Sequence, residues 1–530
     1  MDLGSRAYHH DESIHAHTAW SILQGAKYEY DPVYHGPFLY FAEALLFKVL
    51  GASDYSGRLL PAIFGFALVL AIPMLLRREL GRHGTWIAML AITLSTGFMY
   101  FSRFNRNDIF VAFWTLIVMS CLIRFVSSPE RKWVLLTGLA FGFSFATKEN
   151  TYISGFVFVS FVILMGAWVL LARAKLISES AVLKKISKAF LALRQDLTGI
   201  AVALVLFAVI VGLFMSSFLI NLANLPQSIL LSLTQWIEIS GTERVNQPWY
   251  FYLIFLAVYE VFALVFSLLI LVSIKNRVGL FVFMVVYWAV ANIYIYSVVG
   301  EKAPWISVHV ILPLILLAAW CANALIEASK SRVKQISVVV SMLVLISWTA
   351  RNSIPVTFAH GDVPVDFVIY TQTSRDVKTA LSVIETVANR EGTGTETAIY
   401  LESESHWPYA WYLREYSNVN YGPVLYAPPE EKIVLVSMNT ANSVGAQFGN
   451  YTGVRFKLRE WFPEHVYKSW ELSSIGDLFT EKGNLKRLFG FYFRRIPPDD
   501  LGSTDFVMYL HKDLLANGPI PPFSWWQLEY

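Results

Sequence analysis

The first 350 residues contain ten long apolar runs separated by short polar connections. A helix that crosses the hydrocarbon core needs about 20 apolar residues, within a range of about 17–25. Eight runs reach this length, while 133–147 and 335–350 are shorter and count as spans because the alternation of loops requires them. The pattern predicts an α-helical polytopic membrane bundle of about ten spans over residues 59–350. The runs are 59–76, 85–101, 109–126, 133–147, 151–172, 198–220, 250–274, 278–299, 306–325 and 335–350.

The regions that flank the bundle have different patterns. Within residues 1–58, the stretch 37–50 is apolar but too short to span and carries aromatic and charged residues at intervals, which predicts an interfacial helix. From 351 to 530 the apolar runs shorten to strand length, and helical periodicity appears over 376–389. Strands that alternate with helices predict a soluble α/β domain. The strand-like runs are 366–370, 398–401 and 432–437.

Basic residues are distributed unevenly among the connections. Alternate connections hold seventeen Lys and Arg residues in one set and five in the other. Because cytoplasmic loops of membrane proteins are enriched in Lys and Arg, the first set is predicted to be cytoplasmic. Residues 1–58 and the domain 351–530 then lie on the extracytoplasmic side of the plasma membrane. The smaller set is Arg103, Arg106, Lys148, Arg244 and Lys302.

Composition agrees with a membrane protein and excludes some partners. Of 530 residues, 55% are hydrophobic and only 15% are charged, whereas soluble domains have about 25% charged residues. The net charge of +3 is small and is explained by the connections predicted to be cytoplasmic, so no nucleic-acid partner is indicated. Both cysteines, Cys121 and Cys321, lie inside predicted spans, which excludes a disulfide framework.

Ionisable side chains gather in the connections predicted to be extracytoplasmic. Charges at that membrane surface need a reason other than topology. Cations there could hold the phosphate of a lipid, and a carboxylate could be the base for a nucleophilic hydroxyl or amine. The residues concerned are Asp11, Glu12, His35, Arg58, Arg106, Asp108, Lys148 and Lys302.

Four motifs carry a resemblance to a known family. They are HDESxHA at 10–16, YDPxYHGPFLY at 30–40, Gly followed after six residues by RLLP at 51–61, and EKxPW at 301–305. The pattern resembles the GT-C membrane glycosyltransferases, in the branch of protein mannosyltransferases and lipid A aminoarabinose transferases. Within this branch, the residues of the motifs are similar to those of the flippase-activity-associated subfamily of archaea and bacteria. The resemblance covers about residues 5–350.

The resemblance implies an enzyme that takes a sugar from a polyprenyl-phosphate-linked donor, a membrane lipid, and transfers it to a lipid, glycan or protein acceptor. Direct displacement would invert the anomeric centre. Asp11 would be the base, Glu12 completes that pair, and Asp108 matches the acid of the second loop. No cofactor is implied, and a divalent metal is left open. The residues implied to bind the donor phosphate are His35, Arg58, Arg106, Lys148 and Lys302.

Other interpretations of these residues stay open. Arg106 and Asp108 also fit an ordinary salt-bridged helix end, and Lys302 before Pro-Trp fits an interfacial anchor. The histidines at 9, 10, 15 and 17 match no strong metal template. The alternative function is a transporter or flippase component that moves a lipid-linked sugar without transferring it, and a third is a degenerate scaffold. The absence of an inverted repeat weighs against the transporter.

The resemblance also bears on the start of the chain. Members of these families have a transmembrane helix before the first-loop acids, whereas ten residues precede Asp11 here. The resemblance therefore implies a further span encoded upstream of Met1. That span would bring the total to eleven and would place the N-terminus in the cytoplasm.

Overall fold

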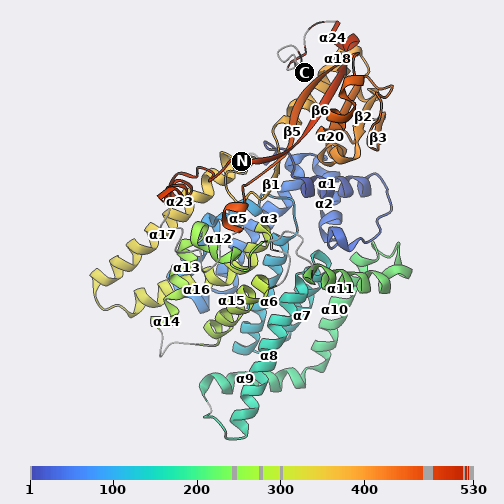
Figure 1. Cartoon of the computed structure of the whole chain (residues 1–530). Helices are drawn as coiled ribbons and strands as arrows, with labels where there is room; N and C mark the ends of the chain where they lie inside the picture. Colours follow the sequence, from blue (N-terminus) through green and yellow to red (C-terminus); the bar gives the residue numbers. More distant parts are fainter. Residues whose placement is uncertain are drawn as a thin grey trace. The chain divides into compact units, whose positions relative to one another are not determined.

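A computed structural model describes residues 3–178, 180–241, 247–273, 279–298, 302–468, 482–516, 518, 520–521 and 523. They form two compact units (Figure 1). The first unit comprises Met1–Ser21, Leu50–Gly57 and His360–Tyr530, and the second comprises Ile22–Val49 and Arg58–Ala359. The segment 1–58 is thus divided between the units.

The second unit is a bundle of membrane helices. Among the described residues, seven helices are long and apolar enough to cross a membrane, and an eighth span results if the bent pair α12 and α13 is counted as one. The predicted helical membrane protein is therefore confirmed, whereas the predicted ten or eleven spans are not confirmed. The seven are α3 (Asp54–Leu75), α6 (Asp108–Ser127), α8 (Thr151–Arg173), α10 (Leu197–Met215), α15 (Leu280–Val298), α16 (Ser307–Ala328) and α17 (Arg332–Phe358).

Two of the predicted runs do not form a single helix that is long and apolar enough to cross a membrane. The run 85–101 is divided between α4 (Arg77–Leu94) and α5 (Thr96–Phe101). Ser95 leaves the helical conformation there, and its hydroxyl caps α5 by accepting the N–H of Phe98. The run 133–147 forms α7 (Arg131–Thr147), which is only 17 residues long.

A sharp bend interrupts the run 250–274. The helices α12 (Phe251–Tyr259) and α13 (Val261–Leu268) meet at an angle of 103°. The residue between them, Glu260, is buried. Its carboxylate accepts hydrogen bonds from Ser95 Oγ at 2.7 Å and from the Gly97 N–H at 3.1 Å. The bend is therefore tied to the break between α4 and α5.

Helix α16 forms the centre of the bundle. Of its apolar stretch, 94% is buried, and it packs against α4, α13, α15 and α17. Outer spans keep large apolar side chains exposed, which suits a lipid surrounding that is as apolar as leucine. Helix α10 lies beside α7, and α7 beside α6 (Figure 1). The other elements of this unit are η1 (Pro32–Tyr34), α2 (Phe38–Leu50, the helix predicted at 37–50), α9 (Ala181–Gln195), η2 (Leu222–Asn224), α11 (Leu225–Gly241), α14 (Ile270–Ser273) and η3 (Pro304–Ile306).

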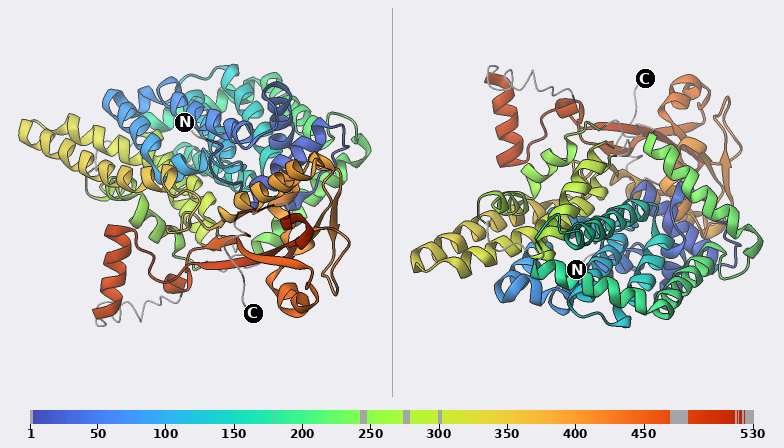
Figure 2. Two further views of the ribbon diagram at one scale, coloured as in Figure 1. Left: turned by 90° about the horizontal axis from the view of Figure 1, so that it is seen from above. Right: turned by 90° about the horizontal axis from the view of Figure 1, so that it is seen from below.

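The first unit contains a mixed six-stranded sheet of order β1-β5-β6-β4-β2-β3. The strands β2, β3 and β4 are parallel to one another, and the others pair antiparallel. The long strands β5 and β6 run side by side (Figure 1 and Figure 2). The strands are β1 (Thr371–Thr373), β2 (Ile399–Glu402), β3 (Val419–Gly422), β4 (Ile433–Ser437), β5 (Tyr451–Trp461) and β6 (Gly502–His511).

Helices cover both faces of this sheet. Because side chains alternate along a strand, Leu401 and Leu435 face the buried side of α18 (Asp376–Glu391), while Tyr400 and Val434 face α20 (Met438–Val444). The predicted α/β domain and its helix at 376–389 are thus confirmed. The shorter elements are η4 (Gly394–Glu396), η5 (Ser403–Ser405), α19 (His406–Tyr412), η6 (Gly445–Gln447), α21 (His465–Lys468), α23 (Lys482–Arg494) and α24 (Lys512–Ala516).

The strand predictions were partly wrong. The runs 398–401 and 432–437 form β2 and β4, but residues 366–370 form a turn in which the N–H of Ile369 donates to the carbonyl of Asp366. The two longest strands, β5 and β6, were not predicted.

The N-terminal segment belongs to the sheet unit. The carbonyl of Ala7 accepts a hydrogen bond from Gln372 Nε2 at 3.2 Å, and the N–H of Tyr8 donates to Tyr412 Oη at 2.8 Å. The carboxylate of Asp54 accepts from Tyr412 Oη at 2.9 Å. Helix α1 (His10–Leu23), which carries the first-loop acids, therefore begins on the sheet unit.

Candidate active site

Buried charged residues meet at one end of the membrane helices. Asp108 is the first residue of α6, where the helix dipole favours a negative charge. Lys148 directly follows α7, and its Nζ lies 2.9 and 3.1 Å from the two carboxylate oxygens of Asp108. Arg106 Nε and His309 Nε2 approach the same carboxylate to 3.7 and 3.4 Å. Asp108 is therefore surrounded by donors.

A second acid–base pair lies beside the first. His35 Nδ1 is 2.9 Å from Glu149 Oε2, and Tyr30 Oη donates to Glu149 Oε1 at 3.1 Å. Burial raises the pKa of Glu149, but the hydrogen bond from His35 and the positive charge of Lys148 outweigh burial and bring that pKa below its usual value. Burial and the charge of Glu149 raise the pKa of Tyr30, so its hydroxyl stays protonated. Glu149 is thus a carboxylate with two donors.

Arg106 connects the two pairs. Its Nη2 lies 3.5 Å from His35 Nε2, and its guanidinium carbon lies 3.8 Å from the ring centre of Trp305. A guanidinium only donates, so His35 Nε2 must accept and Nδ1 must carry the proton that faces Glu149. The network therefore holds two acidic and two basic side chains, besides His35, within one buried region.

A glycine brings His35 to this place. The N–H of Gly36 donates to the carbonyl of Thr147 at 3.1 Å. A Cβ at Gly36 would lie 2.3 Å from the carbonyl oxygen of Ala146, so only glycine permits this approach. The end of α7 thereby fixes both the His35 loop and Lys148.

Two further predicted cations are also buried. Arg58 lies in α3 with none of its surface exposed, and Lys302 is 7% exposed just before η3. In the same unit, Glu43 Oε1 accepts a hydrogen bond from Asn105 Nδ2 at 2.7 Å. Glu301, the other charged residue of the EKxPW motif, lies outside the described residues.

The first-loop acids have different environments in the sheet unit. Glu12 is fully buried at the third position of α1, where its Oε2 accepts the N–H of His9 at 2.9 Å in the manner of a capping box, and Arg6 lies 3.8 Å from Oε1. Asp11 keeps 27% of its side chain exposed and lies 4.0 Å from His9 Nδ1. That nitrogen accepts the N–H of Asp11 at 3.0 Å. Glu12 therefore caps the helix, while Asp11 faces outward.

A family model and two solved structures of a membrane protein match this chain. A family model described as dolichyl-phosphate-mannose-protein mannosyltransferase matches residues 34–185. The apo structure of ArnT from Cupriavidus metallidurans matches with a TM-score of 0.58 and 13% identity, over 84% of this chain and 91% of that one. The same protein bound to undecaprenyl phosphate matches with a TM-score of 0.59 and 14% identity, over 86% and 93%. The comparison with curated proteins finds no match.

The chain has the GT-C fold. The likeness extends over most of the chain, so the resemblance inferred from the motifs is confirmed at the level of fold. With its apolar helices, the chain is a multi-pass membrane protein.

Within the GT-C bundle, four of the predicted site residues form one network. These are His35, Arg106, Asp108 and Lys148, whereas Asp11 and Glu12 belong to the sheet unit. Three members of the network were not predicted as site residues. Glu149 follows Lys148 directly, and His309 is an ionisable residue inside an apolar run, which is itself a signal of function. Tyr30 gives no comparable signal.

The histidines of the first loop do not form a metal site in the described part of this GT-C chain. No group of three or more His, Cys, Asp or Glu side chains there is placed to hold a metal ion. His9 instead caps α1, and the ring of His17 lies 5.7 Å from that of Trp20.

Proposed function

We propose that the chain is a glycosyltransferase that moves a sugar from a polyprenyl-phosphate-linked donor to an acceptor on the extracytoplasmic face. The buried ion network carries this proposal. Each ion taken out of water costs several kcal/mol, so charges buried at the ends of membrane helices are kept for a function. The bound lipid named for the structurally similar ArnT, undecaprenyl phosphate, is the class of lipid that the proposal needs.

The donor phosphate would bind the cations of the membrane unit. Arg106 and Lys148 are both paired with the carboxylate of Asp108, so the phosphate of an arriving donor can replace that carboxylate as their partner. Asp108 then positions the two cations and does not act as the base, because it is already held by donors. Arg58 and Lys302 would complete the cationic surface, while His35 would orient Arg106.

Asp11 is the better placed of the two first-loop acids to act as the base. Glu12 is buried and bound by the cap of α1 and by Arg6, whereas 27% of the Asp11 side chain is exposed. The carboxylate of Asp11 would take the proton of the acceptor hydroxyl or amine while that atom bonds to the anomeric carbon. The bond from the sugar to the phosphate breaks at the same time, and the polyprenyl phosphate leaves with the electron pair. Attack opposite the leaving group inverts the anomeric centre.

The orientation of this reaction rests on loop charge. The seventeen basic residues of one set of connections favour a cytoplasmic location for that set, which leaves the ion network and the sheet unit outside. A transporter is not favoured, since its ionisable groups would be expected near the middle of the membrane. In this chain they gather where α6 begins and α7 ends.

The test is transfer of a labelled sugar from a polyprenyl-phosphate donor by the purified chain. Asp11→Asn should lower turnover by about 10²–10⁴-fold, the usual loss for a general base, with donor affinity nearly unchanged. Glu29→Gln, an exposed acid of the same loop, is the matched control and should transfer normally. Normal turnover by Asp11→Asn would overturn the assignment of the base. The absence of transfer by the unaltered chain, with movement of the lipid-linked sugar across a vesicle membrane, would favour the transporter.

A further inference from the structure

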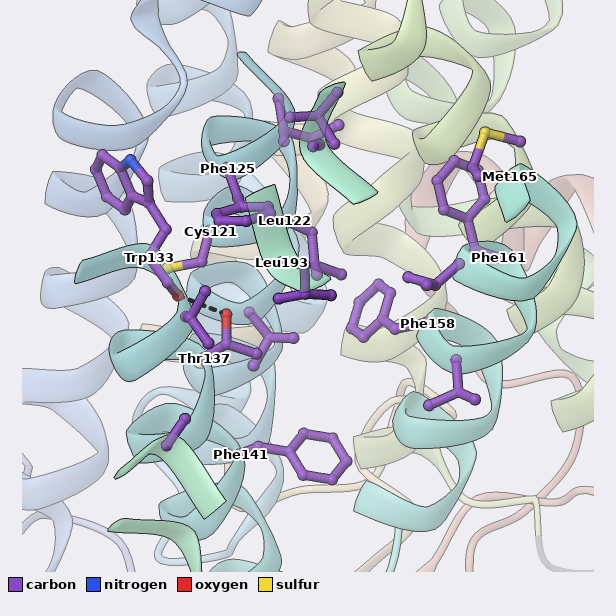
Figure 3. A pocket seen from close by; sticks show the side chains of 18 of the residues that line it. Cys121, Leu122, Phe125, Trp133, Thr137, Phe141, Phe158, Phe161, Met165 and Leu193 are labelled. Atoms are coloured by element: carbon purple, nitrogen blue, oxygen red, sulfur yellow. Dashed lines mark hydrogen bonds between the residues drawn. The ribbon is translucent and has the colours of Figure 1, made fainter. Parts of the chain in front are cut away.

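A large apolar cavity lies inside the membrane unit, between α6, α7, α8, α9, α10 and α15. Its volume of about 600 Å³ falls within the range of about 300–1,000 Å³ that is usual for ligand sites. Figure 3 shows Cys121, Phe125 and Trp133 on one side of the space, and Phe158 and Phe161 on the other. The hydroxyl of Thr137 donates to the carbonyl of Trp133 at 2.8 Å and is thereby satisfied (Figure 3). The cavity therefore suits a hydrocarbon.

The cavity opens sideways, toward the lipid. Three of the residues that line it are themselves largely exposed: Val159 by 58%, Ile163 by 65% and Leu204 by 63%. They belong to α8 and α10, two helices that are apolar enough to span the membrane. A hydrocarbon chain can therefore enter from the bilayer without crossing water.

A polar hollow lies next to the cavity along α8 and α9. It is lined by Val169 on α8 and Leu183 on α9, one turn beyond Met165 and Ile186 of the apolar cavity. Arg173, Lys175 and Ser187 also line it, and none of its described lining residues is acidic. Arg173 Nη2 lies 3.1 Å from Ser187 Oγ, which orients the guanidinium. An apolar space thus ends in a basic one.

The dimensions suit one leaflet of a bilayer. Fifteen residues of α8 separate Phe158 from Arg173, which corresponds to about 22 Å of helix. One leaflet, from the bilayer centre through its headgroup region, is about 20–22 Å deep. Helix α9 closes this side with its buried face, formed by Leu183, Ile186 and Ala189. The arrangement matches an amphiphile with one charged end.

The cavity is separate from the ion network. It is lined by residues of the second half of α6, from Val118 to Val126, whereas Asp108 begins that helix. Ten residues of helix, about 15 Å, separate Asp108 from Val118. An occupant whose phosphate lies at Arg173 therefore leaves the network untouched.

We propose that this cavity binds an anionic phospholipid, with an acyl chain between α6, α8 and α10 and the phosphate at Arg173 and Lys175. Basic pockets between membrane helices are known sites for anionic head groups. The proposal stands whether or not the chain transfers sugars, because it uses none of the residues assigned to that reaction.

The test is native mass spectrometry of the full chain in detergent, titrated with phosphatidylglycerol and with phosphatidylcholine of identical acyl chains. Phosphatidylglycerol should bind about tenfold more tightly, the value of one charged hydrogen bond. The double variant Arg173→Ala, Lys175→Ala should bring its affinity to that of phosphatidylcholine. The control Arg332→Ala, Lys334→Ala, which removes two exposed basic residues elsewhere, should leave the difference unchanged. Equal affinity for both lipids in the unaltered chain would overturn the proposal.

The binding of the acyl chain is tested by blocking the opening of the apolar cavity toward the lipid. Ile163→Trp should weaken both lipids about tenfold, whereas Leu164→Trp, whose position is also exposed but does not line the cavity, should not. Leu204→Phe makes the same test from α10 if the first variant does not fold. Unchanged binding by a folded variant of this opening would overturn the proposal. Full displacement of phosphatidylglycerol by polyprenyl phosphate, one for one, would also overturn it and assign the cavity to the sugar donor. Sugar transfer by the Arg173→Ala, Lys175→Ala protein should stay normal.

Discussion

Replacing Lys148 by methionine should destabilise the membrane unit while keeping the volume of the side chain. The change leaves the buried carboxylate of Asp108 without the ammonium group that contacts both of its oxygens. Removing one partner of a buried ion pair costs about 3–5 kcal/mol. Arg106 and His309 remain at 3.7 and 3.4 Å from the carboxylate, so we expect the lower end, about 3 kcal/mol. The loss should appear as a lowered midpoint of thermal unfolding in detergent.

The double variant Asp108→Asn, Lys148→Met separates stability from activity. Removing both charges relieves the buried carboxylate, so the midpoint should return to within about 1 kcal/mol of the unaltered chain. Transfer should stay low, because one of the cations proposed to hold the donor phosphate is missing. A Lys148→Met protein as stable as the unaltered chain would refute the coupling of these two residues. Recovery of full transfer by the double variant would show that Lys148 serves only to neutralise Asp108.

Three further outcomes follow from the fold and the site. Arg58→Ala and Lys302→Ala should each raise the apparent donor KM by about 10–100-fold with little change in kcat, because a charged hydrogen bond is worth about 1.5–3 kcal/mol. An unchanged KM would show that the residue does not bind the donor phosphate. Gly36→Ala should cost about 1–3 kcal/mol of stability through its clash with Ala146, while Gly449→Ala, with nothing within 4 Å, should be neutral in the same unfolding assay. Reporter fusions in the basic connections should read cytoplasmic, and an external reading would reverse the proposed orientation; the positions are Arg82, Lys132, Lys185 and Lys334.

Local pattern predicted most of the membrane helices but not their interruptions. The runs that became α6, α8 and α16 contain enough apolar residues to define a span without reference to any partner. Ser95 and Glu260 interrupt two other runs, and they do so together, through a hydrogen bond between residues 165 positions apart. A prediction made from about 20 consecutive residues cannot include a hydrogen bond to so distant a residue.

The sheet was predicted incompletely for a different reason. The signal for β5 was present, because Val454, Phe456 and Leu458 alternate with polar residues and are buried, whereas Arg455 and Lys457 are exposed. It was overlooked in favour of continuous apolar runs. Such a run at 366–370 instead became a turn, since burial alone does not provide a partner strand.

The candidate site shows where sequence reasoning ends. A motif indicated His35, whereas Asp108 and Lys148 were indicated as charged residues of connections that were expected at the same membrane surface. The pairing of His35 with Glu149, 114 positions away, depends on the contact of Gly36 with the end of α7. The same limit applies to Glu12, whose role as a helix cap could have been inferred from its position after His9 but whose pairing with Arg6 could not.

The bend at Glu260 has a consequence for how the protein is made. The helices α12 and α13 have 9 and 8 residues, so neither is long enough to leave the insertion machinery as a span by itself. Their polar corner is satisfied by Ser95 and Gly97, which are synthesised earlier, and α13 packs on α16, which is synthesised later. This part of the bundle can therefore be completed only after α16 has emerged. A nascent chain stopped before α16 would lack the helix on which α13 packs, so the bent pair would wait in the translocon or the bilayer for its partner.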